Sequence, residues 1–115
     1  MFISVLCASV LFAAAPKPDI LKLTSVVPKI FTPQEGSSAI NRVKFTYDYN
    51  GTSEITVRIY DISGAMVCGN VYRESDTVMY WDGTDKDGGF VKSGIYIYQI
   101  EAGKNVLNGT IIVAK

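Results

Sequence analysis

The stretch that most constrains the fold runs from Trp81 to Glu101 and reads WDGTDKDGGFVKSGIYIYQIE. One large aromatic residue is followed by a segment rich in aspartate and glycine, which leads into a run of isoleucines and tyrosines. Asp-Gly and Ser-Gly pairs favour chain reversals, because glycine adopts positive φ without steric cost. The stretch therefore predicts a strand, a tight turn region and a second strand. In that second strand Gln99 and Glu101 mark the solvent face, so Tyr96, Tyr98 and Ile100 are expected to point inward.

Strict alternation of polar and apolar residues extends this pattern along the chain. It is clearest in residues 43–49 and 54–59, which flank the hairpin signal Asn50-Gly51. Beyond the first 15 residues, no segment keeps a helical period. We expect an irregular segment over 29–41 and a polar loop over 73–76. The pattern predicts an all-β, seven-stranded sandwich of immunoglobulin-like or fibronectin III-like type; the other strands are expected at 20–27, 65–72, 77–81 and 106–114.

Length and charge limit the functions that the chain can serve. It has 115 residues, enough for one domain, and 11 basic residues balance 11 acidic ones. No net field draws the chain to nucleic acid, so no nucleic-acid partner is expected. The sequence contains no histidine, which removes the usual general base and the commonest metal ligand. Triad hydrolases are thereby excluded, and we expect a protein that is not an enzyme.

Residues 1–15 are expected to be a signal peptide. The run at 2–15 is apolar or small throughout, is short for a membrane span, and ends in Ala13-Ala14-Ala15, which suits cleavage near Ala15. No lysine or arginine precedes the run, which leaves a misplaced start or a cropped fragment as alternatives. Residues 16–19 are then a linker and 20–115 the module. The expected location is periplasmic, outer-surface or extracellular, with no transmembrane span after cleavage.

Cleavage would leave Cys68 as the one remaining cysteine, since Cys7 belongs to the leader. We interpret Cys68 as a small buried hydrophobe; the alternative is a thiol for pairing between molecules. Trp81 has two interpretations as well. It either fills the space between the two sheets or serves as an exposed recognition residue, and the first suits a sandwich core.

The one acidic cluster in the sequence consists of Asp82, Asp85 and Asp87. Three carboxylates with turn carbonyls could form a weak calcium site, although the spacing does not match an EF-hand loop. The preferred interpretation is that these side chains cap backbone N–H groups of tight turns, with glycines at the positive-φ positions. No cofactor other than calcium is expected.

Several of these residues together resemble a known family. The residues concerned are Ile59-Tyr60-Asp61, Gly64, Trp81-Asp82-Gly83, Asp85, Gly88, Val91, Ser93-Gly94 and Tyr96. They resemble the Ig-like domain of the flagellar hook-capping protein family and, equally, the C-terminal modules of secreted bacterial proteins, including gliding-motility and type IX secretion sorting domains. The resemblance covers about residues 26–115 and implies a bacterial protein. Its structural motif comprises Trp81, Gly83, Gly88, Ser93, Gly94 and Tyr96.

The resemblance also bears on calcium. In many relatives the segment that begins like Phe31-Thr32-Pro33 continues as a loop rich in aspartate and asparagine. Here that loop keeps only Glu35 and Asn41 as oxygen donors among its charged or amide side chains.

Three function classes follow. The first is a non-catalytic exported module for cell-surface attachment, secretion sorting or assembly, which presents a sheet edge or loop end to a protein partner. The second is a structural subunit or spacer of a surface or hook-like filament. The third, a hydrolase, would need a cleft with perturbed carboxylates, for which the sequence offers no candidates. The sequence leaves the oligomeric state open.

Overall fold

The structure is a computed structural model, and it describes residues 18–34, 36, 40–69 and 71–114. The predicted signal peptide, 1–15, lies outside the described residues, as do the first two residues of the predicted linker. Among the described residues the secondary structure is entirely β, with nine strands. Their bounds are β1 Leu21–Val27, β2 Ile30–Phe31, β3 Val43–Tyr49, β4 Ile55–Asp61, β5 Met66–Cys68, β6 Tyr72–Ser75, β7 Val78–Trp81, β8 Gly94–Ala102 and β9 Asn105–Val113.

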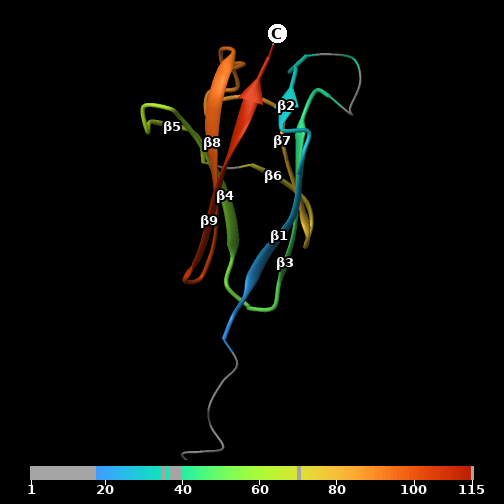
Figure 1. The fold of residues 1–115 in the computed structure, drawn as a ribbon, viewed down its shortest axis with the longest axis vertical. Coiled ribbons are helices and arrows are strands. Elements are labelled where there is room, and N and C mark those ends of the chain that lie inside the picture. The colour runs from blue at the N-terminus through green and yellow to red at the C-terminus, as the bar shows by residue number, and fades with distance from the viewer. Residues whose placement is uncertain (1–17, 35, 37–39, 70, 115) are drawn as a thin grey trace, which may run out of the picture.

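These strands form two sheets that face each other as a β-sandwich (Figure 1). One sheet has the order β1-β3-β7-β6, and the other has the order β2-β9-β8-β4-β5. All pairings are antiparallel except that of β2 with β9, which is parallel. Over the described part of the chain there is no helix long and apolar enough to cross a membrane.

The nine strands exceed the seven predicted because one strand lies in a segment predicted to be irregular and one predicted strand is divided between the sheets. The first strand ends before Pro28, as predicted, since proline has no N–H to continue a ladder. Beyond it, β2 joins the opposite sheet, where Ile112 N donates to Lys29 O at 2.7 Å and Ala114 N donates to Phe31 O at 2.8 Å. The segment predicted to be irregular at 29–41 therefore contains a strand.

A break divides the strand predicted at 65–72. Its first part, β5, pairs with β4, whereas β6 pairs with β7 in the other sheet. The polar loop predicted at 73–76 is in fact the end of β6 over most of its length. Alternation in sequence identifies which residues are buried, but it does not show to which sheet a short strand belongs.

The core lies between the sheets and is rich in aromatic residues. Trp81, 1% exposed, meets Phe31 and Tyr96 edge to face at centroid distances of 5.4 and 5.7 Å. Its Nε1 donates to Thr84 O at 2.9 Å, so its one polar group is satisfied. Below it, Phe45 and Tyr98 make a similar contact at 5.2 Å. Cys68 is buried, as predicted.

Candidate functional site

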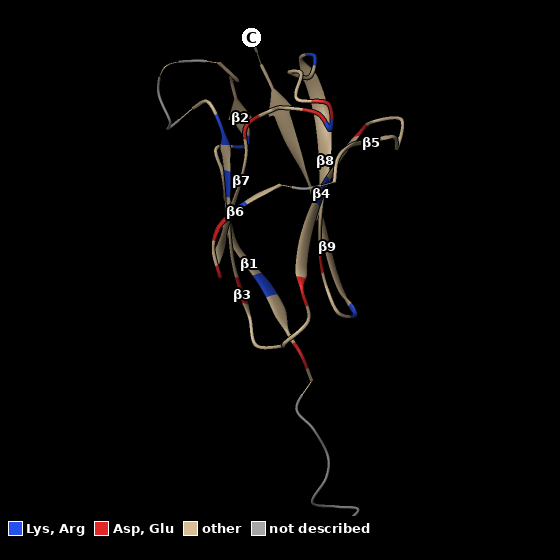
Figure 2. Cartoon of the chain, turned by 180° about the vertical axis from the view of Figure 1, so that it is seen from behind, with Lys and Arg blue, Asp and Glu red and all other residues tan. Residues whose placement is uncertain are grey.

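The acidic turn after β7 holds its own carboxylates in hydrogen bonds. Asp82 Oδ1 accepts from Thr84 N at 3.1 Å and from Thr84 Oγ1 at 2.6 Å. Asp85 Oδ1 accepts from Asp87 N at 2.9 Å and from Gly89 N at 3.0 Å. This is the geometry of side chains that cap tight turns. The turn lies at the same end of the sandwich as the C-terminus (Figure 2).

The other residues of the sequence motif surround this turn. Gly83 and Gly88 have φ of 87° and 88°, the region that glycine adopts without strain. A Cβ at Gly83 would meet Pro33 Cγ at 2.6 Å, so the turn packs closely on the loop after β2. Ser93 and Gly94 lead into β8. There the Tyr96 hydroxyl donates to Lys92 O at 2.7 Å.

A positively charged side chain lies near the acidic turn at this end of the sandwich. Asn41 and Asp82 line one hollow together with Arg42, whose guanidinium stacks on the Tyr80 ring at 3.9 Å. Glu35, the other donor considered for calcium, lies outside the described residues. Within the described ranges no group of three or more acidic, cysteine or histidine side chains is arranged to hold a metal ion. Calcium binding stays a prediction, which a calcium titration followed by calorimetry and melting temperature tests.

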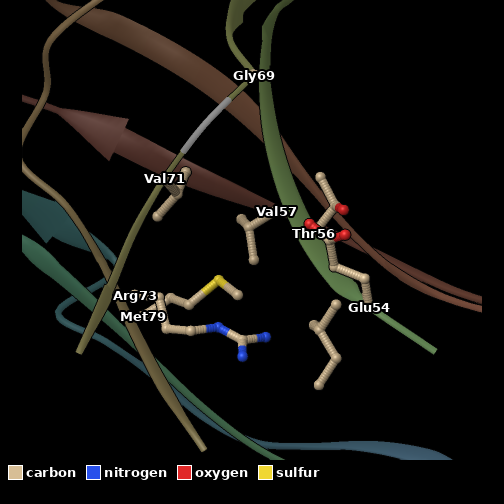
Figure 3. A pocket seen from close by; sticks show the side chains of 8 residues that line it. Glu54, Thr56, Val57, Gly69, Val71, Arg73 and Met79 are labelled. Carbon is tan, nitrogen blue, oxygen red and sulfur yellow. The ribbon is translucent and has the colours of Figure 1, made fainter. Parts of the chain in front are cut away.

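A better candidate lies halfway along one side of the sandwich, where β4 faces β6 and β7 across the gap between the sheets. A pocket of about 350 Å³ opens there beneath the segment that crosses from β5 to β6. Its inner walls are apolar, and Figure 3 shows Val57, Val71 and Met79 pointing into it. Thr56 on β4 and Glu54, just before that strand, lie at the rim.

Arg73 gives this apolar pocket a positive charge. Its side chain extends from β6 into the pocket (Figure 3), because Arg73 lies opposite the inward-facing Met79 in the β6–β7 pair. Among the described residues no carboxylate lies within ion-pair distance of Arg73; the ion pair found there joins Arg58 to Glu101, at 2.9 Å on the outer face. Arg73 is exposed to solvent, and Glu54 also lines the pocket, so the lining carries one charge of each sign.

Tyr47 lies beside Arg73 but does not line the pocket. Its side chain is fully buried, and its hydroxyl lies close enough to the Arg73 guanidinium for a hydrogen bond of poor geometry, with no better partner among the described residues. Burial raises the pKa of this hydroxyl, and the nearby positive charge of Arg73 opposes that rise. The phenol therefore keeps its proton at neutral pH and is able to donate it in a hydrogen bond.

The backbone of β4 is open along the same pocket. β5 pairs only with Ile59 and Tyr60 of β4, so its pairing ends above Val57. Asp61 N donates to Ala65 O on the β5 side at 2.9 Å. Because amide directions alternate along a strand, and β4 pairs with β8 without a bulge, the backbone groups of Val57 and Ile55 point to that side too. Within the described ranges no strand pairs with β4 on this side below Ile59; Asn70, which the register would bring opposite Val57, lies outside them.

Sequence reasoning missed this site. The predicted polar loop included Arg73, and no motif marks Tyr47 as other than a core residue. Had the segment that ends at Ser75 been predicted as a strand, its alternation would have placed Arg73 on the inward face. That prediction could have revealed the site. The site depends on which strands face each other across the gap, and a single sequence does not show this.

Comparison with known proteins supports the fold and leaves the family open. No protein-family model matches the chain, and no curated protein does. Among solved structures the chain is similar to dimeric latent PorU from Porphyromonas gingivalis, with a TM-score of 0.57 and 21% identity over 87% of this chain. The chain spans 10% of the length of PorU. The class of protein that the fold defines is a two-sheet β-sandwich, and the resemblance to the hook-capping family stays a prediction.

Proposed function

We propose that this chain is a non-catalytic, exported bacterial module that binds a protein partner in secretion sorting, attachment or assembly at the cell surface. The observation that carries the proposal is the side of the sandwich where, among the described residues, no strand pairs with β4 below Ile59 and a pocket with apolar inner walls opens beside it. Unpaired strand edges are where other chains add to a sheet, and an extended partner segment gains backbone hydrogen bonds there.

The likeness to PorU supports the β-sandwich fold on which the proposal rests, and it covers a small part of PorU. We infer an immunoglobulin-like arrangement from the strand order. β1-β3-β7-β6 corresponds to strands A, B, E and D, and β9-β8-β4 corresponds to G, F and C, with β2 and β5 as additions. This fold serves many functions, so the site and not the fold carries the argument.

An export assay tests the proposal. A reporter enzyme is inserted at the linker, residues 16–19, so that the leader precedes it and the module follows. In a bacterium with type IX secretion, we expect the reporter outside the cell. The matched control lacks residues 20–115, and its reporter should stay in the periplasm. Equal retention of both reporters in the periplasm would contradict a sorting role.

One observation favours the spacer alternative. The described chain enters at β1 at one end of the sandwich and leaves after β9 at the other end (Figure 1). A module with its termini at opposite ends can link neighbours in a row. Light scattering of the full chain at high concentration separates the two ideas, since a filament subunit should form oligomers and a module for a foreign partner should stay monomeric.

A further inference from the structure

We propose that the outer face of the five-stranded sheet carries an uncharged strip through which two copies of this chain form a twofold pair. The inference goes beyond the proposed function, because it uses a different surface from the pocket beside β4. It also refines the light-scattering test: a pair closed by a twofold axis stops at twice the mass of one chain, whereas a filament adds copies without limit.

The strip consists of two rows of side chains that cross the sheet near the end of the sandwich where β9 ends. The strand register places the members of each row side by side, and the burial pattern of each strand shows that they face outward. The first row is Ile30, Ile112 and Ile95, and the second is Thr110, Ile97, Tyr60 and Met66. None of these side chains carries a charge.

The apolar side chains of the strip are strongly exposed. Ile30, Ile95 and Met66 keep 59%, 51% and 51% of their surface accessible, and Ile112 keeps 40%. The strip thereby presents an apolar area on the order of 500 Å², which is in the range of the largest patches on monomeric proteins. Patches of that size often serve a contact with another molecule.

The rest of the outer surface of both sheets differs from the strip. The next two rows of the same sheet, toward its other end, carry the ion pair of Arg58 with Glu101 at 2.9 Å. On the outer face of the four-stranded sheet, Lys22 lies opposite Asp48, and Lys44 lies farther along β3. Charged side chains are thus the rule on these outer faces, and the strip is an exception.

A second copy suits the strip in shape, charge and area. A twisted sheet face packs well against another sheet face of the same twist, about 10 Å away and turned by about 30°. A twofold axis sets the same uncharged rows opposite each other, whereas a single peptide strand or helix would cover only part of a strip that crosses five strands. Because the apolar area is below the roughly 800 Å² per partner of a standard interface, the pair should be weak.

The experiment measures the mass of the full chain by sedimentation equilibrium. We expect pairing with a dissociation constant on the order of 100 µM, as for an interface smaller than the standard size. Ile95→Lys sets two like charges into the contact and should weaken pairing about tenfold or more. The matched control Val106→Lys changes a side chain of similar exposure, 46%, on the same outer face but outside the strip, and it should pair like the unchanged chain.

All three proteins keep residues 1–17, so association through the apolar run at 2–15 would be common to them. Melting curves show whether Ile95→Lys folds, and Ile112→Lys in the same row decides if it does not. Equal pairing of all three proteins would overturn the inference. Absence of pairing up to about ten times the expected dissociation constant would overturn it as well, because about nine-tenths of each binding site should be filled there.

Two further outcomes would also overturn the inference. A mass that grows beyond twice that of one chain would mean a filament contact and not a closed pair. A chain that stays monomeric, but whose Ile95→Lys variant loses export of the reporter, would assign the strip to a foreign protein. The export assay with the unchanged module decides on the proposed function separately in every case.

Discussion

The two long sides of the sandwich, where the edge of one sheet meets the edge of the other, are built differently. On the β1–β9 side, β2 joins the first strand segment to the opposite sheet, and the Tyr98 ring covers Gly109. Asn105 Nδ2 also donates to Asp19 O at 3.2 Å, which ties the start of the described chain to β9. On the β4–β6 side, the crossing from β5 to β6 leaves a pocket beneath it. We call these the closed side and the open side.

The difference shows that the core of a two-sheet fold must be covered along its two sides as well as between the facing sheets. The closed side is filled by groups that belong to the chain itself. On the open side, no described strand pairs with β4 below Ile59, and Arg73 lines the pocket without an ion pair to a described carboxylate. The predictions below separate these two kinds of side.

The largest expected change in the free energy of unfolding is on the closed side. Gly109→Ala would place a Cβ within the Tyr98 ring, so the ring must move out of the core. We expect the free energy of unfolding to fall by about 1–3 kcal/mol, as overpacking does, measured by urea denaturation. The control Gly36→Ala has nothing within 4 Å of its Cβ and should leave stability unchanged. An equally stable Gly109→Ala variant would show that the closed side is not tightly filled.

On the open side, we expect a variant whose free energy of unfolding increases. Tyr47→Phe removes a buried hydroxyl whose one neighbouring donor among the described residues, Arg73, is poorly placed for a hydrogen bond, so it should raise the free energy of unfolding by about 1 kcal/mol. The matched control Tyr96→Phe loses the bond to Lys92 O and should lower that free energy by about the same amount. If both variants lose stability, the Tyr47 hydroxyl has a partner and the site is not as described.

The turn between β4 and β5 limits how much of β4 is free. Hydrogen bonds from the Ser63 hydroxyl and from the Ala65 N–H lower the pKa of Asp61. Its charged form therefore stabilises the turn above the pKa of the unfolded chain, about 4, and this contribution is lost as pH falls through the lower pKa of the folded state.

Asp61→Asn should accordingly melt below the unchanged chain at neutral pH, and the gap should close in acid. Ser63→Ala, which removes one donor to the same carboxylate, should show a smaller loss of the same sign. A gap that stays constant from neutral pH to about pH 2, below the usual aspartate range, would contradict this account of the turn.

The smallest change in the free energy of unfolding is expected for a substitution at Arg73. Because no partner in the described chain holds its guanidinium in an ion pair, Arg73→Gln should change the free energy of unfolding by no more than about 0.5 kcal/mol. Arg58→Gln, which loses the half-exposed contact with Glu101, should cost up to about 1 kcal/mol. A larger loss for Arg73 than for Arg58 would mean that Arg73 serves the fold and not a ligand.

The buried faces of the long strands were more accessible to sequence reasoning than either side of the sandwich. Alternation in β3, β4 and β8 predicts which of their side chains are buried, because that pattern needs only the period of a strand. The end of the first strand at Pro28 was predicted, but the strand beyond it and the break after Cys68 were not, since sequence does not show to which sheet a short strand belongs. Arg73 and Tyr47 are 26 residues apart, and only the pairing of β3 and β6 with β7 brings them together.

The most direct test of the open side is hydrogen exchange along β4 in the full chain. The N–H groups of Thr56 and Arg58 point to β8 and should exchange slowly, as should that of Ile59 opposite Cys68. The N–H of Val57, between two protected neighbours, should exchange much faster. Protection of Val57 equal to that of Thr56 would mean that this edge is already paired, and it would contradict the account.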